Sequence, residues 1–141
     1  MTYHPIFLID TGIFVAFFNR NDRYHAQVYS FIRGTTSMML TTVACITEVL
    51  HLLPRQTKVQ SDLFLMLAEG IVDCEHLQIQ DFSRIAELNV RYADIKPDFA
   101  DLSLVAISER LDIPAIATLD SDFDVYRRYR KQPFERVFRP T

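Results

Sequence analysis

Hydrophobic positions along the chain follow two patterns that alternate from one end to the other. Short runs rich in β-branched and aromatic residues predict strands, and longer segments with apolar residues three and four positions apart predict helices. The predicted strands are 6–9, 37–42, 72–79, 114–119 and 135–138. The predicted helices are 11–18, 22–33, 43–54, 61–70, 81–94 and 97–111. Strands and helices therefore alternate along nearly the whole chain.

This alternation predicts an α/β fold in a single domain, residues 1–141. Parallel strands need crossover connections of a dozen or more residues, and the predicted helices supply them. We therefore expect a three-layer α/β/α arrangement, with helices on both faces of a mainly parallel central sheet. The 141-residue chain shows no internal repeat and no low-complexity segment, as one domain of ordinary size requires. In such sheets, ligands bind at the carboxyl ends of the strands.

The stretch PIFLIDTGIFVAFF, residues 5–18, places one carboxylate in an otherwise apolar run. Asp10 comes directly after the first predicted strand, and an unpaired carboxylate in a low-dielectric interior costs several kcal/mol. Asp10 therefore needs a cation, hydrogen-bond donors or a helix N-terminus as its partner. Asp120 stands in a similar place, directly after the apolar residues of the predicted strand 114–119.

Further carboxylates lie on the predicted helices. Glu48 has apolar neighbours around most of its helix, and Asp101 opens the stretch ADLSLVAI just after Asp98. Each acid also has a local explanation: an N-cap or first-turn position for the aspartates and a solvated helix surface for Glu48. Carboxylates gathered at one sheet edge would repel one another unless divalent cations hold them ionised. All-oxygen ligation selects hard ions such as Mg²⁺ or Mn²⁺.

Three other chemistries that this sequence suggests do not fit it. A haloacid dehalogenase phosphatase needs a second aspartate two positions after the first, where this chain has Gly12. The spacing from Glu48 to His51 matches a di-iron helix bundle, but the second copy and the all-helical pattern are missing. We expect His51 at a helix surface or core edge instead. The three glycines of the chain form no phosphate-binding loop.

Four short acidic motifs, in this order and in these predicted elements, resemble those of the PIN domain. They are LIDTG with Asp10, TEVL with Glu48, DFADLSLVAISERL with Asp101, and ATLDSDF with Asp120. The resemblance spans about residues 5–125. It implies a PIN-like fold and a Mg²⁺- or Mn²⁺-dependent ribonuclease.

Within the PIN family, the chain is most similar to the VapC toxins of bacterial type II toxin–antitoxin systems. This resemblance implies hydrolysis of RNA phosphodiester bonds with a metal-activated water, a small VapB-like antitoxin as partner and a homodimer. Catalytic and metal-binding roles carry over to Asp10, Glu48, Asp101 and Asp120, and supporting roles to Thr11, Asp98, Thr118 and Asp122. Two alternatives stay open: a housekeeping PIN nuclease in RNA processing, and a catalytically weak PIN-like module that binds RNA or protein.

Charge is unevenly distributed along the chain, although the net charge is only −3. Residues 127–141 carry six basic side chains and one acid, a net +5, which leaves −8 on residues 1–126. A basic end of this kind contacts a phosphate backbone, forms a solvated terminal helix or docks on an acidic partner. Our hypothesis for the segment 126–141 is RNA contact, through Arg127, Arg128, Arg130 and Lys131.

The predicted location is the cytoplasm, without membrane association. The N-terminal apolar run has no basic region before it and no small-residue cleavage site, and Asp10 interrupts it. Cys45 and Cys74 show neither CxxC spacing nor a disulfide framework, which fits a reducing compartment.

Overall fold

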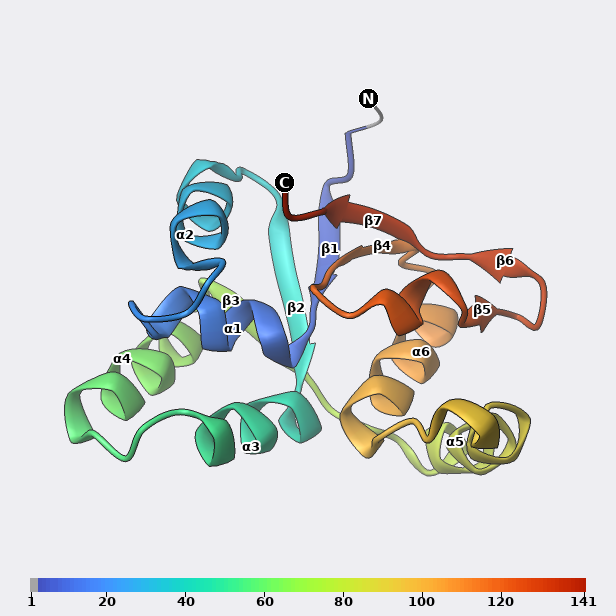
Figure 1. Ribbon diagram of the computed structural model, residues 1–141. Coiled ribbons are helices and arrows are strands. Elements are labelled where there is room, and N and C mark those ends of the chain that lie inside the picture. Colours follow the sequence, from blue (N-terminus) through green and yellow to red (C-terminus); the bar gives the residue numbers. More distant parts are fainter. Residues whose placement is uncertain (1–2) are drawn as a thin grey trace.

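A five-stranded parallel sheet forms the centre of the computed structural model, which describes residues 3–141 (Figure 1). Its strand order is β3–β2–β1–β4–β7, and each neighbouring pair is parallel. The strands are β1 (Ile6–Ile9), β2 (Met38–Thr42), β3 (Val72–Glu75), β4 (Ala115–Ala117) and β7 (Glu135–Phe138). The predicted α/β fold with a mainly parallel sheet is confirmed.

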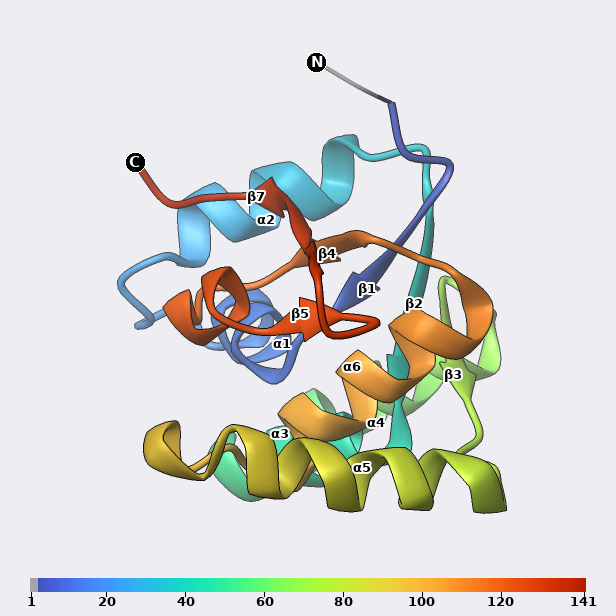
Figure 2. The ribbon, with the colours of Figure 1, turned by 90° about the vertical axis from the view of Figure 1, so that its right-hand side faces the viewer.

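Within residues 3–141, six α-helices surround this sheet. They are α1 (Thr11–Phe18), α2 (His25–Gly34), α3 (Val43–Leu52), α4 (Thr57–Ala68), α5 (Ile79–Arg91) and α6 (Phe99–Leu111). Figure 1 shows α1, α2 and α4 on one side of the sheet, α5 and α6 on the other, and α3 below it. In the turned view, α5 crosses beneath α6 (Figure 2). In this part of the chain, none of the helices combines the length and the apolar character needed to cross a bilayer.

The central strand β1 contributes to a hydrophobic core on each face of the sheet. Phe7 and Ile9 belong to the core that includes Val28 of α2, whereas Leu8 belongs to the core that includes Ile107 of α6. Side chains alternate between the two faces along a strand, so a strand that is buried on both faces is apolar throughout. Because β1 is apolar over its whole length, Asp10 is the first polar residue at its carboxyl end.

Two boundaries near α5 differ from the prediction because of a helix cap. The predicted strand 72–79 ends at Glu75, and the helix expected from residue 81 begins at Ile79. The Asp81 carboxylate accepts the backbone N–H of Gln78 at 2.8 Å, in a capping box that starts the helix early. Polar residues at the end of an apolar run therefore belong to the helix cap and not to the strand.

Two helix starts also differ from the prediction. The helix expected from residue 61 begins at Thr57, where Lys58 and Asp62 form an ion pair of 2.9 Å on the exposed first turn. The helix expected from residue 22 begins at His25, because the Asp22 side chain forms a turn and accepts the N–H of Tyr24 at 2.8 Å.

A short hairpin in the basic C-terminal segment was not predicted. It pairs β5 (Arg127–Arg128) with β6 (Gln132–Pro133) in antiparallel fashion. Its turn holds Tyr129 and Arg130 at φ values of 50° and 69°, in the left-handed region that non-glycine residues rarely adopt. The Glu109 carboxylate accepts the N–H of Tyr129 at 2.8 Å and so supports this turn. The segment forms a hairpin and the edge strand β7, not a terminal helix.

Candidate metal centre

Asp10 meets hydrogen-bond donors at the carboxyl end of β1. One carboxylate oxygen accepts the backbone N–H of Thr11 at 2.8 Å, as the N-cap of α1. The other accepts the hydroxyl of Thr118 at 2.7 Å. Asp10 is only 4% exposed, so both donors act where little water competes for the carboxylate. The apolar run therefore tolerates Asp10 because two donors and a helix N-terminus face it.

Thr118 connects Asp10 to the second predicted strand end. Its hydroxyl oxygen also accepts the backbone N–H of Asp120 at 2.9 Å. Asp120 in turn accepts the backbone N–H of Asp122 at 2.8 Å and begins a short 3-10 helix, Ser121–Asp124. The loop after β4 is thereby shaped so that Asp120 lies beside Asp10, as the parallel-sheet argument predicts.

Asp101 enters from the first turn of α6, and a tyrosine that sequence reasoning missed holds it. The Tyr126 hydroxyl donates to an Asp101 carboxylate oxygen at 2.9 Å. The Tyr126 ring is fully buried and packs edge-on against Tyr92 and Phe123. Nothing in the sequence distinguishes Tyr126 from an ordinary core aromatic, since only the fold brings it to Asp101.

Three carboxylates form the tightest acidic group in the described part of the chain. One oxygen each from Asp10, Asp101 and Asp120 lie within 4.8 Å of one another. They open into a cavity of about 390 Å³ that Glu48 and Asp98 also line. The structure therefore brings together the four acids predicted to be catalytic, with Glu48 on the cavity wall from α3.

Burial and mutual repulsion disfavour the charged forms of these acids. Burial, with smaller contributions from the charges of Asp120 and Asp98, raises the pKa of Asp10 to about 7 against the opposing hydrogen bonds. Burial, then the charges of Asp10 and Asp98, raises the pKa of Asp101 to about 8. Burial and the Asp98 charge also raise the pKa of Glu48. A cation in this cavity would reverse these shifts.

The residues present fit a hard divalent cation. The donor set is made of carboxylate oxygens, which suit Mg²⁺ or Mn²⁺. Thr11 lines the same cavity, and its buried hydroxyl has no hydrogen-bond partner within residues 3–141. A buried hydroxyl without a partner is costly, and an ion with its waters would supply one.

Asp98 has a clear structural role. It is the N-cap of α6, and its carboxylate accepts the backbone N–H of Asp101 at 2.8 Å. It also lines the acidic cavity and is exposed to solvent. The cap uses one carboxylate oxygen of Asp98 and orients the turn that carries Asp101.

Arg128, expected at an RNA surface, is buried instead. It is 2% exposed, and its guanidinium donates to the Ser108 hydroxyl at 2.6 Å and to the Asp112 carboxylate at 2.8 Å. This burial removes Arg128 from the residues that can meet RNA. The net charge of a segment does not show which of its charged side chains the fold buries.

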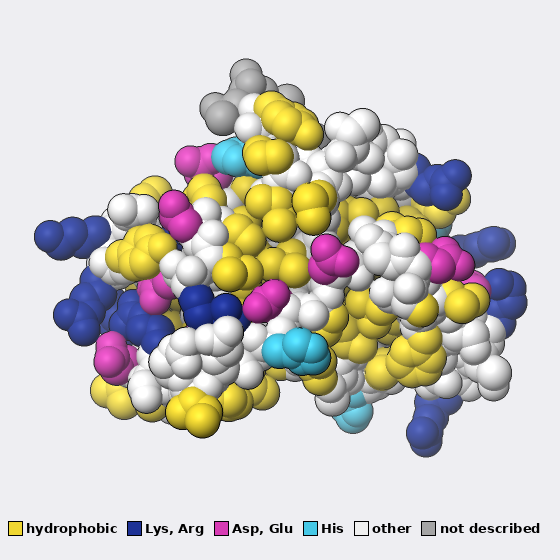
Figure 3. Space-filling model, turned by 180° about the vertical axis from the view of Figure 1, so that it is seen from behind, with side chains coloured by type: hydrophobic (Ala, Val, Ile, Leu, Met, Phe, Trp, Pro, Cys, Tyr) yellow, Lys and Arg dark blue, Asp and Glu magenta, His cyan; other side chains and the backbone are white. Residues whose placement is uncertain are grey.

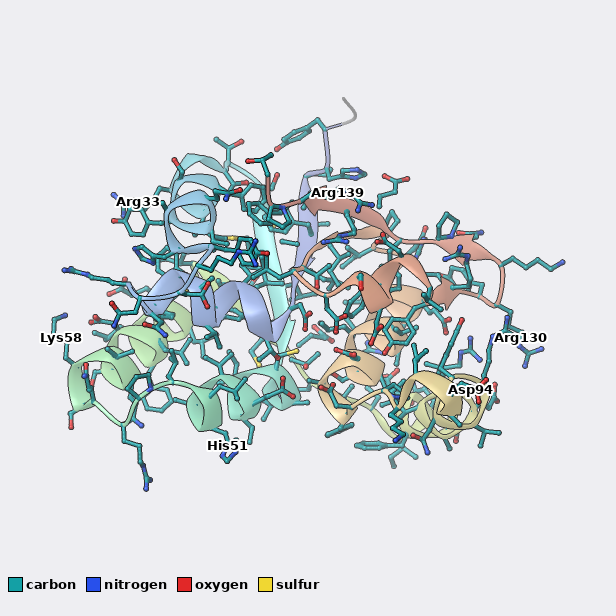
Figure 4. All side chains as sticks on the ribbon, in the orientation of Figure 1. Arg33, His51, Lys58, Asp94, Arg130 and Arg139 are labelled. Atoms are coloured by element: carbon teal, nitrogen blue, oxygen red, sulfur yellow. The ribbon has the colours of Figure 1, made fainter. Side chains whose placement is uncertain are left out.

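The other three predicted RNA contacts lie outside the acidic cavity. Arg127 is half-buried and donates to backbone carbonyls of its own turn, whereas Arg130 and Lys131 are exposed. Arg130 points outward from the end of the hairpin (Figure 4). On the face shown in Figure 3, basic side chains gather mostly at the two margins, with hydrophobic side chains between them. His51 is exposed on α3, as expected, and points away from the fold (Figure 4).

Comparisons with known proteins agree with the motifs. The family model described as the PIN domain matches residues 7–129. Ribonuclease VapC26 of Mycobacterium tuberculosis is 24% identical over 115 residues, which cover 80% of this chain and 85% of that protein.

Two solved structures share the fold. Mycobacterium tuberculosis VapC20, described as a sarcin-ricin loop cleaving toxin, superposes with a TM-score of 0.76 at 20% identity, over 85% of this chain and 93% of that one. A chain of VapBC2 from Rickettsia felis, solved with a DNA fragment of its promoter, gives a TM-score of 0.65 at 13% identity, over 93% of this chain and 98% of that one.

Replacing Asp10 by Asn should stabilise the metal-free protein at high pH. An acid with a raised pKa binds more protons when folded, so the wild type in EDTA should lose stability as pH rises from the ordinary value of 3.8 to the folded values of about 7 and 8. The asparagine carbonyl accepts the Thr11 N–H, its NH2 group donates to the Thr118 hydroxyl oxygen, and the side chain carries no charge. At pH 8 in EDTA, thermal unfolding should occur at least ~3 °C higher than in the wild type, the shift that roughly 1 kcal/mol gives a domain of this size.

The same substitution should weaken Mn²⁺ binding by about tenfold or more, measured by electron paramagnetic resonance. Asp62→Asn is the matched control, because Asp62 is an exposed acid on α4 outside the cavity. It should change neither the pH dependence nor the Mn²⁺ affinity. An Asp10→Asn protein with wild-type Mn²⁺ affinity would refute the ligand assignment.

Serine substitutions should separate Asp98 from Asp101. Serine caps a helix nearly as well as aspartate, so Asp98→Ser should keep the melting temperature and most of the Mn²⁺ affinity. Asp101→Ser should lose Mn²⁺ affinity by about tenfold or more, because it removes one of the three clustered carboxylates. An equal loss of affinity in both variants would show that Asp98 is also a ligand.

Proposed function

The chain belongs to the PIN domain family, and from this premise we propose that it is a divalent-metal-dependent endoribonuclease, the toxin of a type II toxin–antitoxin pair. The observation that carries the proposal is the convergence of Asp10, Asp101 and Asp120 on one cavity. The match to a protein named a ribonuclease, and the fold shared with a toxin described as cleaving the sarcin-ricin loop, support it.

Asp10, Asp101 and Asp120 would hold the ion, and Glu48 lines the same cavity from α3. A Mg²⁺ or Mn²⁺ ion bound there supplies charge neutralisation at the scissile phosphate and lowers the pKa of an attacking water. The protein supplies no nucleophile of its own in this scheme. Glu48 is half-buried and lines the cavity, so its carboxylate would accept a proton from water there.

Two hydroxyl groups keep the acidic residues in position. Thr118 fixes one oxygen of Asp10 and the backbone of Asp120, and Tyr126 fixes one oxygen of Asp101. Thr11, whose buried hydroxyl has no hydrogen-bond partner within residues 3–141, also lines the cavity. Substrate phosphate therefore meets carboxylates whose orientations are set before it binds, which lowers the reorganisation needed during the reaction.

RNA would reach this cavity across a surface with exposed basic groups. Arg130 and Lys131, at the tip of the hairpin, are exposed and available for phosphate contacts, and Arg127 lies at its base. Such contacts position the RNA without reading its sequence. Selection of RNA usually depends on unpaired loops and on shape. As part of this proposal, the enzyme works in the cytoplasm as a homodimer, and both of its cysteines are free thiols.

A small VapB-like antitoxin is the proposed partner. A groove of about 960 Å³ runs between α1, α2 and α4, and Phe17, Tyr29 and Met66 contribute to its lining. The rings of Phe17 and Tyr29 stack with centroids 5.3 Å apart. Such a groove suits apolar anchors of a peptide, and an antitoxin arginine beyond them would meet the acids in fork geometry.

The nuclease activity is tested with purified, antitoxin-free protein and a single-stranded RNA. Cleavage should require Mg²⁺ or Mn²⁺, stop with EDTA, and fall by about 100-fold in Asp120→Asn, while Asp62→Asn keeps it. Attack by water leaves a 5′-phosphate and a 3′-hydroxyl, whereas attack by the ribose 2′-hydroxyl leaves a cyclic phosphate. Cleavage that persists in EDTA, or that leaves cyclic phosphate ends, would contradict the proposed chemistry.

Inhibition by the antitoxin should depend on the metal concentration. An antitoxin arginine at the acids competes with the ion for the same oxygens, so inhibition should weaken as Mn²⁺ rises over about two orders of magnitude at constant ionic strength. Replacing that arginine by Gln should relieve inhibition while the two proteins still associate. Inhibition that is unchanged across the titration would place the blocking contact away from the carboxylates.

A further inference from the structure

Arg136 belongs to the basic C-terminal segment by sequence, yet the fold buries it beside the loop that carries Asp120. It lies on the edge strand β7, and its side chain is only 5% exposed. A cation this deeply buried needs partners that compensate for its lost hydration. The hydrogen bonds of its guanidinium show which segment of the chain it supports.

The Arg136 guanidinium holds both ends of the segment 118–124. One terminal nitrogen donates to the backbone carbonyl of Thr118 at 2.9 Å, and the other pairs with the Asp124 carboxylate at 3.1 Å. Arg139 pairs with the other Asp124 oxygen at 3.0 Å, but its side chain is 61% exposed and its terminal nitrogen lies by β7 at the surface (Figure 4). Of these two arginines, Arg136 therefore reaches the buried end of this segment, at Thr118, and Arg139 does not.

An irregular pairing between β4 and β7 explains why a side chain donates to the Thr118 carbonyl. Strands β4 and β7 pair Ile116 with Arg136 and then Ala117 with Phe138, so the register shifts between these two pairs. Ala117 is the last residue of β4 with a strand partner, and Thr118 follows it. The Arg136 side chain supplies a donor to the Thr118 carbonyl just beyond the end of the ladder.

We propose that Arg136 is a positioning residue for the acidic centre, acting through Thr118. The carbonyl of Thr118 is fixed by Arg136, and the hydroxyl of the same residue orients Asp10 and receives the N–H of Asp120. Arg136 thus holds Thr118, the residue whose hydroxyl links Asp10 to Asp120. This inference rests on the proposed metal centre, and not on the identity of the RNA.

A direct RNA contact by Arg136 does not agree with its surroundings. Its side chain is buried, two of its nitrogens are committed to Thr118 and Asp124, and its remaining Nε atom is buried without a partner within residues 3–141. Lysine at this position keeps the charge but has no fork, so it cannot hold both acceptors. The two contacts therefore depend on the planar guanidinium, which presents two terminal nitrogens at once.

Mn²⁺ affinity measured by electron paramagnetic resonance tests the proposal. Arg136→Gln should weaken Mn²⁺ binding by about 10-fold or more, the usual effect of removing a group that orients metal ligands, and should lower kcat with little change in the KM for RNA. Arg136→Lys, which keeps the charge and most of the volume, should also lose affinity. Arg139→Gln is the matched control: it loses one bond to Asp124 and none to Thr118, and should bind Mn²⁺ like the wild type.

A double-mutant cycle tests whether the effect of Arg136 on the metal site depends on Thr118. If Arg136 acts through Thr118, adding Arg136→Gln to Thr118→Val should weaken Mn²⁺ binding little beyond Thr118→Val alone. Additive losses, a lower melting temperature with unchanged Mn²⁺ affinity, or a raised KM with unchanged affinity would each overturn the proposal. So would absence of Mn²⁺ binding by the wild type. A wild type that binds Mn²⁺ and cleaves no RNA, with the predicted pattern of affinities, would instead refute the proposed nuclease and leave the role of Arg136 standing.

Discussion

The repulsion among buried carboxylates is the constraint on which the rest of this structure depends. Asp10, Asp101 and Asp120 bring oxygens within 4.8 Å of one another, and Asp10 and Asp101 are buried. Such an arrangement is unfavourable without a cation, and burial raises the pKa of Asp10 and of Asp101 accordingly. Hydrogen bonds from Thr118 and Tyr126 hold these acids in place, but they do not neutralise the group. A divalent ion in this cavity would relieve the repulsion.

Much of this site was predictable because the geometry of a parallel sheet is predictable. Alternating strands and helices imply parallel strands, and the carboxyl ends of parallel strands meet at one edge. Asp10 after β1 and Asp120 after β4 were placed together by that argument alone, since β1 and β4 are neighbours. The two acids on helices, Glu48 and Asp101, were assigned to the site from the order of the family motifs. The hydrophobic periodicity of their helices does not indicate that role. An N-cap position was one of the two interpretations of Asp98, and the cap is present.

The hydrogen bonds that support the acids could not be derived from local sequence patterns, because the bonded residues lie far apart in the sequence. Thr118 meets Asp10 across 108 positions, and this pairing was expected only from family resemblance. Tyr126 meets Asp101 across 25 positions, and an aromatic residue that donates a hydrogen bond looks like any other core aromatic in the sequence. The basic segment was misread for a related reason: counting charges treats Arg128 and Arg136 as surface groups, while the fold buries both. The same segment therefore divides into residues that build the protein and a hairpin tip that stays exposed.

The account depends most directly on where a divalent ion binds. Crystals soaked in Mn²⁺ and measured near the manganese absorption edge locate the ion by its anomalous scattering, independently of any activity. The account predicts a peak within coordination distance of carboxylate oxygens of Asp10, Asp101 and Asp120, and the loss of that peak in Asp10→Asn. A peak elsewhere on the protein, or none at Mn²⁺ concentrations that support RNA cleavage, would contradict it.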